Sequence, residues 1–294
     1  MKPVIAAFLL GCSLISVALP SIADDQPASN QNDSADAAFR KQLAELHWIK
    51  GPTQVQLFGN STLNVPDGYV FLNPPEMVKF EAMTHNLGGE TEYFLAPNDL
   101  RWGARFSFKN DGYVKDDEKI DADALLTSIK TGTAEANKER RERGWDEMEV
   151  LGWQAAPHYD TQTNRLEWAV SGKDLKSNTE IVNLNTRILG RGGVMSVVLI
   201  ASPDELTAAT GEFNSTLSGF AYVAGQRYAE YKPGDKIAKY GLAALVTGGA
   251  AAIAVKTGLW KVIVGAVVAG WKFIAAAFVA LFGGLARRFK RKTA

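Results

Sequence analysis

Histidines are the first residues to examine for chemistry, because they titrate near neutral pH and bind metals. The chain has three, His47, His85 and His158, and none has a second histidine at the spacing of a zinc-binding helix. His158 is the candidate catalytic residue together with Asp160, because Tyr159 and Asp160 flank it in a predicted loop between strands. The alternative is a hairpin connection in which Asp160 satisfies the amides of the turn.

Carboxylates form the second group of candidate residues. Six Asp and Glu side chains lie between residues 111 and 123. Asp111, Asp116, Asp117 and Glu118 are candidate calcium ligands, because calcium binds hard oxygen atoms. Their spacing departs from the D-x-[DN]-x-[DN]-G calcium loop. The alternative is a solvated acidic turn that favours the N-terminus of the helix after it.

Glycines surround two arginines near residue 190. Arg187 and Arg191 bracket Gly190, and Gly192 and Gly193 follow, so an anion-binding nest is one interpretation. The pattern lacks the G-x-G-x-x-G spacing and the passage from strand to helix that such a loop needs. A glycine-containing hairpin between two strands is therefore the interpretation that we adopt.

Several familiar enzyme classes leave no signature in this chain. The only cysteine, Cys12, lies in the N-terminal leader, so the rest of the chain has no thiol nucleophile, disulfide or thiolate metal site. The sequence also lacks a G-x-S-x-G elbow and a G-x-x-x-x-G-K-[ST] phosphate loop. It indicates no cofactor. Residues 24–239 are net acidic, which argues against a nucleic-acid partner.

Hydrophobic periodicity predicts an antiparallel-rich α+β fold, a sheet with a few packed helices. Period-two patterns predict short strands near residues 55–57, 63–65, 69–71, 93–96, 101–108, 147–153, 165–171, 179–189, 194–201 and 220–223. Helices are predicted over residues 37–49, 74–86, 122–143 and 203–217. Pro74 should open the second of these helices and Asp121 should cap the third. Glu139 and Arg143 can pair at the end of that third helix.

The two ends of the chain predict export and membrane attachment. Residues 1–23 have the pattern of a signal peptide, with a small-residue cleavage site at Ala23, and a lipoprotein processed at Cys12 is the alternative. Residues 24–36 are predicted to be a disordered lead-in, and residues 37–233 a periplasmic domain. The remaining predicted segments are a membrane-proximal apolar helix over 234–258, a transmembrane anchor over 259–286 and a basic cytoplasmic tail over 287–294.

The predicted anchor carries a lysine and a row of small residues. Lys272 lies in its apolar centre, where we expect it to face another helix and not lipid. Ala276, Ala280 and Gly284 recur at every fourth residue, which lets two helices approach closely. Self-association through this helix is therefore one hypothesis. A membrane hairpin that includes residues 240–255 is the alternative topology, but it would leave the basic tail outside.

Residues 152–160, with the sequence GWQAAPHYD, and residues 166–169, with the sequence LEWA, resemble a bacterial family. The family is the predicted membrane-anchored proteins grouped as domain of unknown function 2167. The similarity extends over residues 112–118, 182–191 and 228–249 and covers nearly everything after about residue 50. The resemblance implies a periplasmic or envelope domain with a C-terminal anchor. It transfers no catalytic residue, because the family carries no established activity.

We therefore expect a membrane-anchored envelope protein of the bacterial inner membrane, whose α+β domain is a periplasmic binding or scaffolding module. Its expected partners are inner-membrane lipid and either an envelope protein or a second copy of the chain. The alternative is an envelope hydrolase that uses carboxylates or His158. A third hypothesis is that the membrane tail is the working part of the protein.

Overall fold

The computed structural model describes residues 39–84 and 91–247. The predicted signal peptide, lead-in, transmembrane anchor and basic tail lie outside the described residues, and so does His85. The anchor residues Lys272, Ala276, Ala280 and Gly284 also lie outside them. Within the two described ranges, no helix is both long and apolar enough to cross a bilayer.

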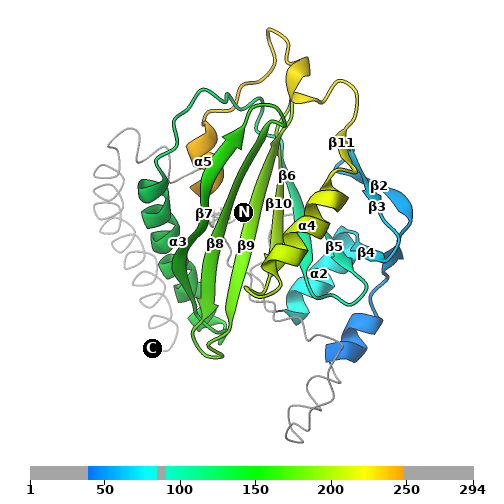
Figure 1. Cartoon of the computed structure of the whole chain (residues 1–294), viewed down its shortest axis with the longest axis vertical. Helices are drawn as coiled ribbons and strands as arrows, with labels where there is room; N and C mark the ends of the chain where they lie inside the picture. Colours follow the sequence, from blue (N-terminus) through cyan, green and yellow to red (C-terminus); the bar gives the residue numbers. More distant parts are fainter. Residues whose placement is uncertain (1–38, 85–90, 248–294) are drawn as a thin grey trace, which may run out of the picture.

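The fold is α+β, as predicted, and it is built on a large antiparallel sheet (Figure 1). Eight strands of the described residues form this sheet, in the spatial order β1 (Ile49–Lys50), β4 (Tyr69–Leu72), β5 (Glu92–Pro97), β6 (Gly103–Lys109), β10 (Val194–Ala201), β9 (Glu180–Leu189), β8 (Arg165–Asp174) and β7 (Met148–Asp160). A smaller antiparallel sheet has the order β11 (Phe220–Tyr222), β3 (Ser61–Val65) and β2 (Thr53–Leu57).

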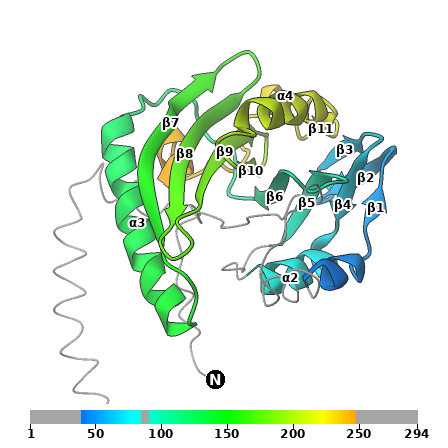
Figure 2. The same cartoon turned by 60° about the horizontal axis from the view of Figure 1, so that its bottom comes forward.

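Helices cover both faces of the large sheet (Figure 2). They are α2 (Pro74–Met83), α3 (Ala122–Glu142), α4 (Leu206–Leu217), α5 (Leu242–Thr247) and the short 3-10 helix η1 (Tyr228–Glu230). One face packs against α4 and the small sheet, and Phe106 and Val197 belong to this first core. The other face packs against α3 and α5 through Trp168 and against α2 through Phe94. Core residues of the two faces alternate along the strands because successive side chains of a strand point to opposite faces.

Capping residues set the helix boundaries. Pro74 opens α2, and the Asn73 side chain accepts a backbone N–H of the first turn. Asp121 caps α3, and its carboxylate accepts a backbone N–H of the first turn at 3.1 Å. Both predicted helix starts are therefore confirmed. The predicted ion pair between Glu139 and Arg143 also forms near the end of α3.

The N-terminal strands divide between the two sheets. The helix predicted over residues 37–49 ends earlier: the described residues 39–44 are helical, and Ile49 pairs with Phe71 in the large sheet. The three short strands predicted over residues 55–71 all form, but β4 joins the large sheet between β1 and β5. The turn after β3 thus carries the chain from one sheet to the other. Cross-sheet packing, which local periodicity does not encode, decides this arrangement.

Strand β7 is longer than predicted. The sequence predicted a strand that ends at residue 153, whereas β7 continues to Asp160 and pairs with β8 through three register shifts. Bulges at these shifts absorb extra residues and keep the two strands together past Pro157. His158 therefore lies in a strand opposite Glu167, and not in the loop that we predicted.

The folded domain continues beyond residue 233, its predicted boundary. Ile237 forms a bridge with Tyr113, and α5 packs Leu242 and Val246 into the second core with 1% and 0% exposure. The described part of the predicted membrane-proximal helix is helical only in α5. The apolar side chains of α5 are buried against α3 and the sheet, so this segment is part of the domain.

Candidate functional site

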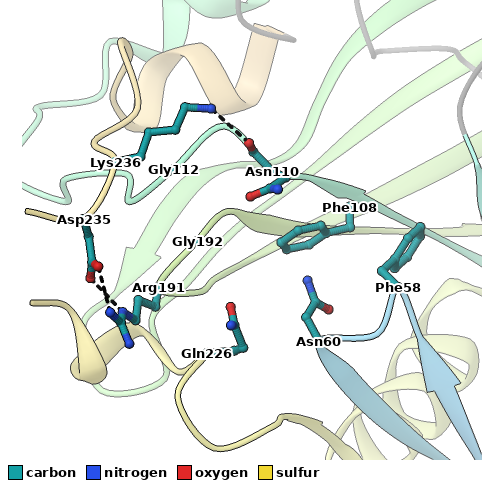
Figure 3. A pocket seen from close by; sticks show the side chains of 10 residues that line it. All are labelled: Phe58, Asn60, Phe108, Asn110, Gly112, Arg191, Gly192, Gln226, Asp235 and Lys236. Atoms are coloured by element: carbon teal, nitrogen blue, oxygen red, sulfur yellow. Dashed lines mark hydrogen bonds and ion pairs between the residues drawn. The ribbon is translucent and has the colours of Figure 1, made fainter.

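A cavity of about 660 Å³ lies where the end of the large sheet meets the small sheet (Figure 3). Five chain segments line it: the β2–β3 turn (Phe58, Asn60), the end of β6 and the residues after it (Phe108, Asn110, Gly112), the β9–β10 turn (Arg191, Gly192), the loop after β11 (Gln226) and the segment before α5 (Asp235, Lys236). Sites for small molecules typically have volumes of ~300–1,000 Å³. The cavity is therefore the candidate functional site.

Backbone hydrogen bonds join these segments into one frame. The Gly112 amide donates to the Gly192 carbonyl at 3.1 Å, and the Arg191 amide donates to the Gln226 carbonyl at 2.9 Å. Gly112 has a φ of +108°, and a Cβ there would lie 2.5 Å from the Lys236 carbonyl oxygen. Only glycine fits this position. The walls of the cavity are thus held by the fold and not by side chains alone.

The β9–β10 turn is the glycine hairpin that the sequence predicted. The Gly190 amide donates to the Gly193 carbonyl at 2.8 Å, which closes the turn. Arg191 at its tip is engaged within the protein, because both carboxylate oxygens of Asp235 accept from its guanidinium at 2.7 Å. This pairing lowers the pKa of Asp235 to about 2. The Asp235 carboxylate thus already pairs with the Arg191 guanidinium, which an anion bound at this turn would need.

Tyr222 of β11 fixes the hairpin from the small sheet. Its hydroxyl donates to the Ile188 carbonyl at 2.8 Å and accepts from the Met195 amide at 2.9 Å. Gly190 lies so close to the ring that a Cβ there would be 2.7 Å from it. The two strands that carry the turn are thereby held against β11, whose following loop supplies the opposite wall.

The cavity has an aromatic wall and an amide wall. The ring centroids of Phe58 and Phe108 are 6.0 Å apart. The amides of Asn60, Asn110 and Gln226 come from three different loops, and those of Asn60 and Gln226 point toward the space beside Phe108 (Figure 3). Amide side chains both donate and accept hydrogen bonds. The two walls suit a ligand with an apolar face and several hydroxyl or amide groups.

Phe58 has an unusual backbone conformation. Its φ is +52°, in the left-handed region, which costs a residue with a side chain about 1–2 kcal/mol. The ring contacts Tyr93 edge to face, with centroids 4.9 Å apart, and this contact holds it at the cavity. The positive φ values of Phe58 and Gly59, with the hydrogen bond from the Asn60 amide to the Leu57 carbonyl, belong to the tight turn between β2 and β3, and this turn places the Phe58 ring at the cavity.

The candidate catalytic residues lie elsewhere, on the β7–β8 hairpin. His158 faces Glu167 across the ladder. Asp160 accepts hydrogen bonds from the Gln162 amide and the Thr163 hydroxyl, both at 2.8 Å, and these bonds lower the pKa of Asp160. Asp160 thus satisfies groups of the turn, as in the alternative interpretation. A catalytic role for His158 stays a prediction.

The candidate calcium ligands contact separate partners. The Tyr240 hydroxyl donates to Asp111 at 2.7 Å, the Tyr159 hydroxyl donates to Asp116 at 3.0 Å, and the Ala243 amide donates to Glu118 at 3.1 Å. Asp117 is exposed. Among the residues that the structure describes, no three His, Cys, Asp or Glu side chains form a group that could hold a metal ion. The geometry gives the calcium hypothesis no support, and three of these carboxylates stabilise the packing of the domain instead.

Sequence reasoning missed most of the cavity. It singled out Arg191 and Gly192 as parts of a glycine hairpin, with an anion-binding nest as the other interpretation. Phe58 and Gln226 belong to no motif. The available signal was the coincidence of amide residues with predicted turns, which is too common to identify a site on its own.

Comparisons with known proteins give a family and distant similarities to solved structures. The profile of a family described as "Protein of unknown function (DUF2167)" matches residues 49–282. No curated protein matches the sequence. Among solved structures, the solution structure of cyanobacterial PsbP (CyanoP) from Synechocystis sp. PCC 6803 is similar, with a TM-score of 0.35 and 10% sequence identity. The similarity covers 58% of this chain and 91% of that one.

Proposed function

The chain belongs to the DUF2167 family of proteins of unknown function, and from this premise we propose that it is an envelope binding module. In this proposal, the cavity between the two sheets holds a small polar ligand. The observation that carries the proposal is the cavity lining: an aromatic wall and an amide wall on a frame of backbone hydrogen bonds. Such a frame presents polar groups in fixed positions, which lowers the entropy cost of binding.

We also propose that the domain lies in the bacterial periplasm and is held to the inner membrane. The predicted signal peptide over residues 1–23, anchor over 259–286 and basic tail over 287–294 support this placement. Inner-membrane lipid is then one partner, and an envelope protein or a second copy is another, with contacts through Ala276, Ala280 and Gly284. The net acidic domain is not suited to nucleic acid.

Protease treatment of spheroplasts tests this placement. Protease added from outside should digest the domain, whereas a tag placed after residue 294 should be protected until the membrane is broken. Digestion of the tag in intact spheroplasts would contradict a single crossing and favour the membrane hairpin.

Photocrosslinking in living cells tests whether the cavity holds a ligand. A benzophenone residue in place of Gln226 should give a recurrent adduct of constant mass. The same residue in place of Gln56, an exposed glutamine of β2 outside the cavity, should not. A second substitution, Gly192→Leu, should remove the adduct by placing a side chain in the part of the cavity beside Gln226. Equal labelling at the two positions, or an adduct that survives Gly192→Leu, would contradict the proposal.

The alternative function is an envelope hydrolase, and the pairing of His158 with Glu167 across β7 and β8 is the observation that favours it. Substitution of His158 by alanine separates the two functions. A binding module should keep its Gln226 adduct in this variant. A hydrolase should lose its activity, and its substrate should accumulate in the cell.

A further inference from the structure

We propose that the ligand of the cavity is an uncharged carbohydrate, with one face of a sugar ring packed against Phe58 and Phe108. This inference rests on the proposed function and names the class of ligand for the same cavity. Three properties of the lining lead to it: the aromatic wall, the positions of the amide oxygens and the internal neutralisation of Arg191.

The aromatic wall matches the apolar face of a sugar ring. The rings of Phe58 and Phe108 are inclined by 34°, and both residues remain partly exposed. Aromatic faces carry negative potential, so they attract the C–H groups that cover one face of a pyranose ring. Phe58 is kept in this wall despite its positive φ, by its contacts with Tyr93 and Phe108.

The amide wall matches the hydroxyl groups at the edge of such a ring. A Cβ on Gly192 would lie 3.4 Å from Gln226 Oε1 and 3.7 Å from Asn110 Oδ1, so these two oxygens converge above the glycine. The Ser61 hydroxyl lies within hydrogen-bond distance of the Asn60 side-chain oxygen at 3.0 Å and of the Leu57 carbonyl at 3.2 Å, so its one proton is shared between them and the Asn60 oxygen is turned toward Ser61. The Asn60 nitrogen then points into the cavity as a donor (Figure 3). Sugar hydroxyls both donate and accept hydrogen bonds, so they can use both kinds of group.

The guanidinium of Arg191 is already paired within the lining. Asp235 occupies the guanidinium of Arg191 with both carboxylate oxygens, and Arg191 Nη1 also donates to the Gly225 carbonyl at 3.3 Å. Lys236 Nζ donates to the Asn110 carbonyl at 3.2 Å. A phosphate would have to displace Asp235, whereas a neutral sugar leaves this pair intact. The Arg191–Asp235 pair therefore favours a neutral sugar over an anion that would need this guanidinium.

Binding of defined sugars to the full chain tests the proposal. The chain is placed in lipid nanodiscs, because sugar-based detergents would compete for the cavity. Chitotriose, cellotriose, maltotriose and inorganic phosphate are titrated separately by calorimetry at low and at high salt. At least one trisaccharide should bind saturably with an affinity that salt does not change, and phosphate should not bind.

Three variants locate the binding. Gly192→Leu places a side chain between Gln226 and Asn110, where the sugar would lie, and it should weaken trisaccharide binding more than ~10-fold. Gln226→Ala removes one hydrogen-bonding group and should weaken binding about 2- to 12-fold. Gln56→Ala on β2 is the matched control and should bind as the wild type does. Circular dichroism and melting temperatures verify that all three variants fold.

The outcomes separate the carbohydrate inference from the proposed function. If no trisaccharide binds, or if only phosphate binds, the carbohydrate class is wrong, while a Gln226 adduct in cells would leave the binding module standing. Trisaccharide binding that is unchanged in both Gly192→Leu and Gln226→Ala would place the sugar elsewhere and overturn the inference. Loss in these two variants with retention in Gln56→Ala supports it.

Discussion

Arg105 is shared by two carboxylates inside the fold. It lies on β6 with 6% exposure, and it pairs with Glu81 of α2 and with Glu92 of β5. One cation facing two carboxylates leaves this group with a net negative charge in a site of low polarity. Burial raises the pKa of Glu92 to about 7, although the charge of Arg105 opposes this effect. Glu92 therefore takes up a proton near neutral pH in the folded protein.

The Glu92→Gln variant tests whether Glu92 takes up this proton in the folded protein. Between pH 4.5, the ordinary pKa of a glutamate, and about 7, the folded state holds a proton that the unfolded state releases. The free energy of unfolding should therefore fall as pH rises through this window, by at most about 1.4 kcal/mol per pH unit from this group. Glu92→Gln should remove that contribution, as measured by melting temperature against pH.

The control for this experiment is Glu142→Gln, which changes an exposed glutamate at the end of α3. It should keep the pH dependence of the wild type. If the melting temperatures of Glu92→Gln and of the wild type change in parallel from pH ~4.5 to ~8, Glu92 keeps its charge throughout this range, as an ordinary glutamate does. That result would contradict the prediction.

At the scale of elements, the side chain of Tyr222 on β11 binds both β9 and β10. The Tyr222 hydroxyl satisfies a carbonyl of β9 and an amide of β10, and its ring is 8% exposed. These bonds lie outside the ladder of the large sheet, so they link the two sheets where the cavity wall begins. The Tyr222 hydroxyl therefore links the hairpin to the small sheet.

Tyr222→Phe should therefore destabilise the domain. The variant keeps the ring but leaves the Ile188 carbonyl and the Met195 amide without the hydroxyl, which costs about 1–3 kcal/mol for buried groups. The expected result is a melting temperature lower by several degrees. Tyr231→Phe keeps a partly exposed ring that contacts Tyr113 with centroids 4.4 Å apart, and it should change little. Equal melting temperatures for the two variants would refute the role of Tyr222.

At the scale of the whole molecule, the segment that leads toward the predicted anchor is part of the fold. Asp111 and Glu118 bind it through Tyr240 and Ala243, and α5 fills the core beside α3. A domain that ended at residue 233 would leave this core open. The predicted membrane attachment thus follows directly after a packed helix, with little chain between them.

Two truncated variants test this boundary. A chain ending at residue 233 loses the buried side chains of Leu242, Leu245 and Val246, each worth roughly 1.5–3 kcal/mol. The loss is of the same order as the whole stability of a typical domain, ~5–15 kcal/mol, so this chain should aggregate or melt early. A chain ending at residue 250 should fold. Similar melting temperatures for both would show that α5 contributes little.

The sequence by itself determined what depends on neighbouring residues. Periodicity predicted most of the strands, and Pro74 and Asp121 predicted two helix starts because helix initiation and capping are local interactions. Composition alone also predicts export and anchoring, since an apolar stretch without acidic residues needs no tertiary partner to prefer a bilayer.

Only the tertiary structure decided what depends on residues far apart in the chain. It placed His158 in a strand and brought Phe58, Asn110 and Gln226 around one cavity. It also gave the candidate calcium ligands separate hydrogen-bond partners, two tyrosine hydroxyls and an amide at the start of α5. Each of these outcomes requires strand register and sheet packing to be set first. A cavity is the space that packed elements leave between them, so no local pattern of residues can specify it.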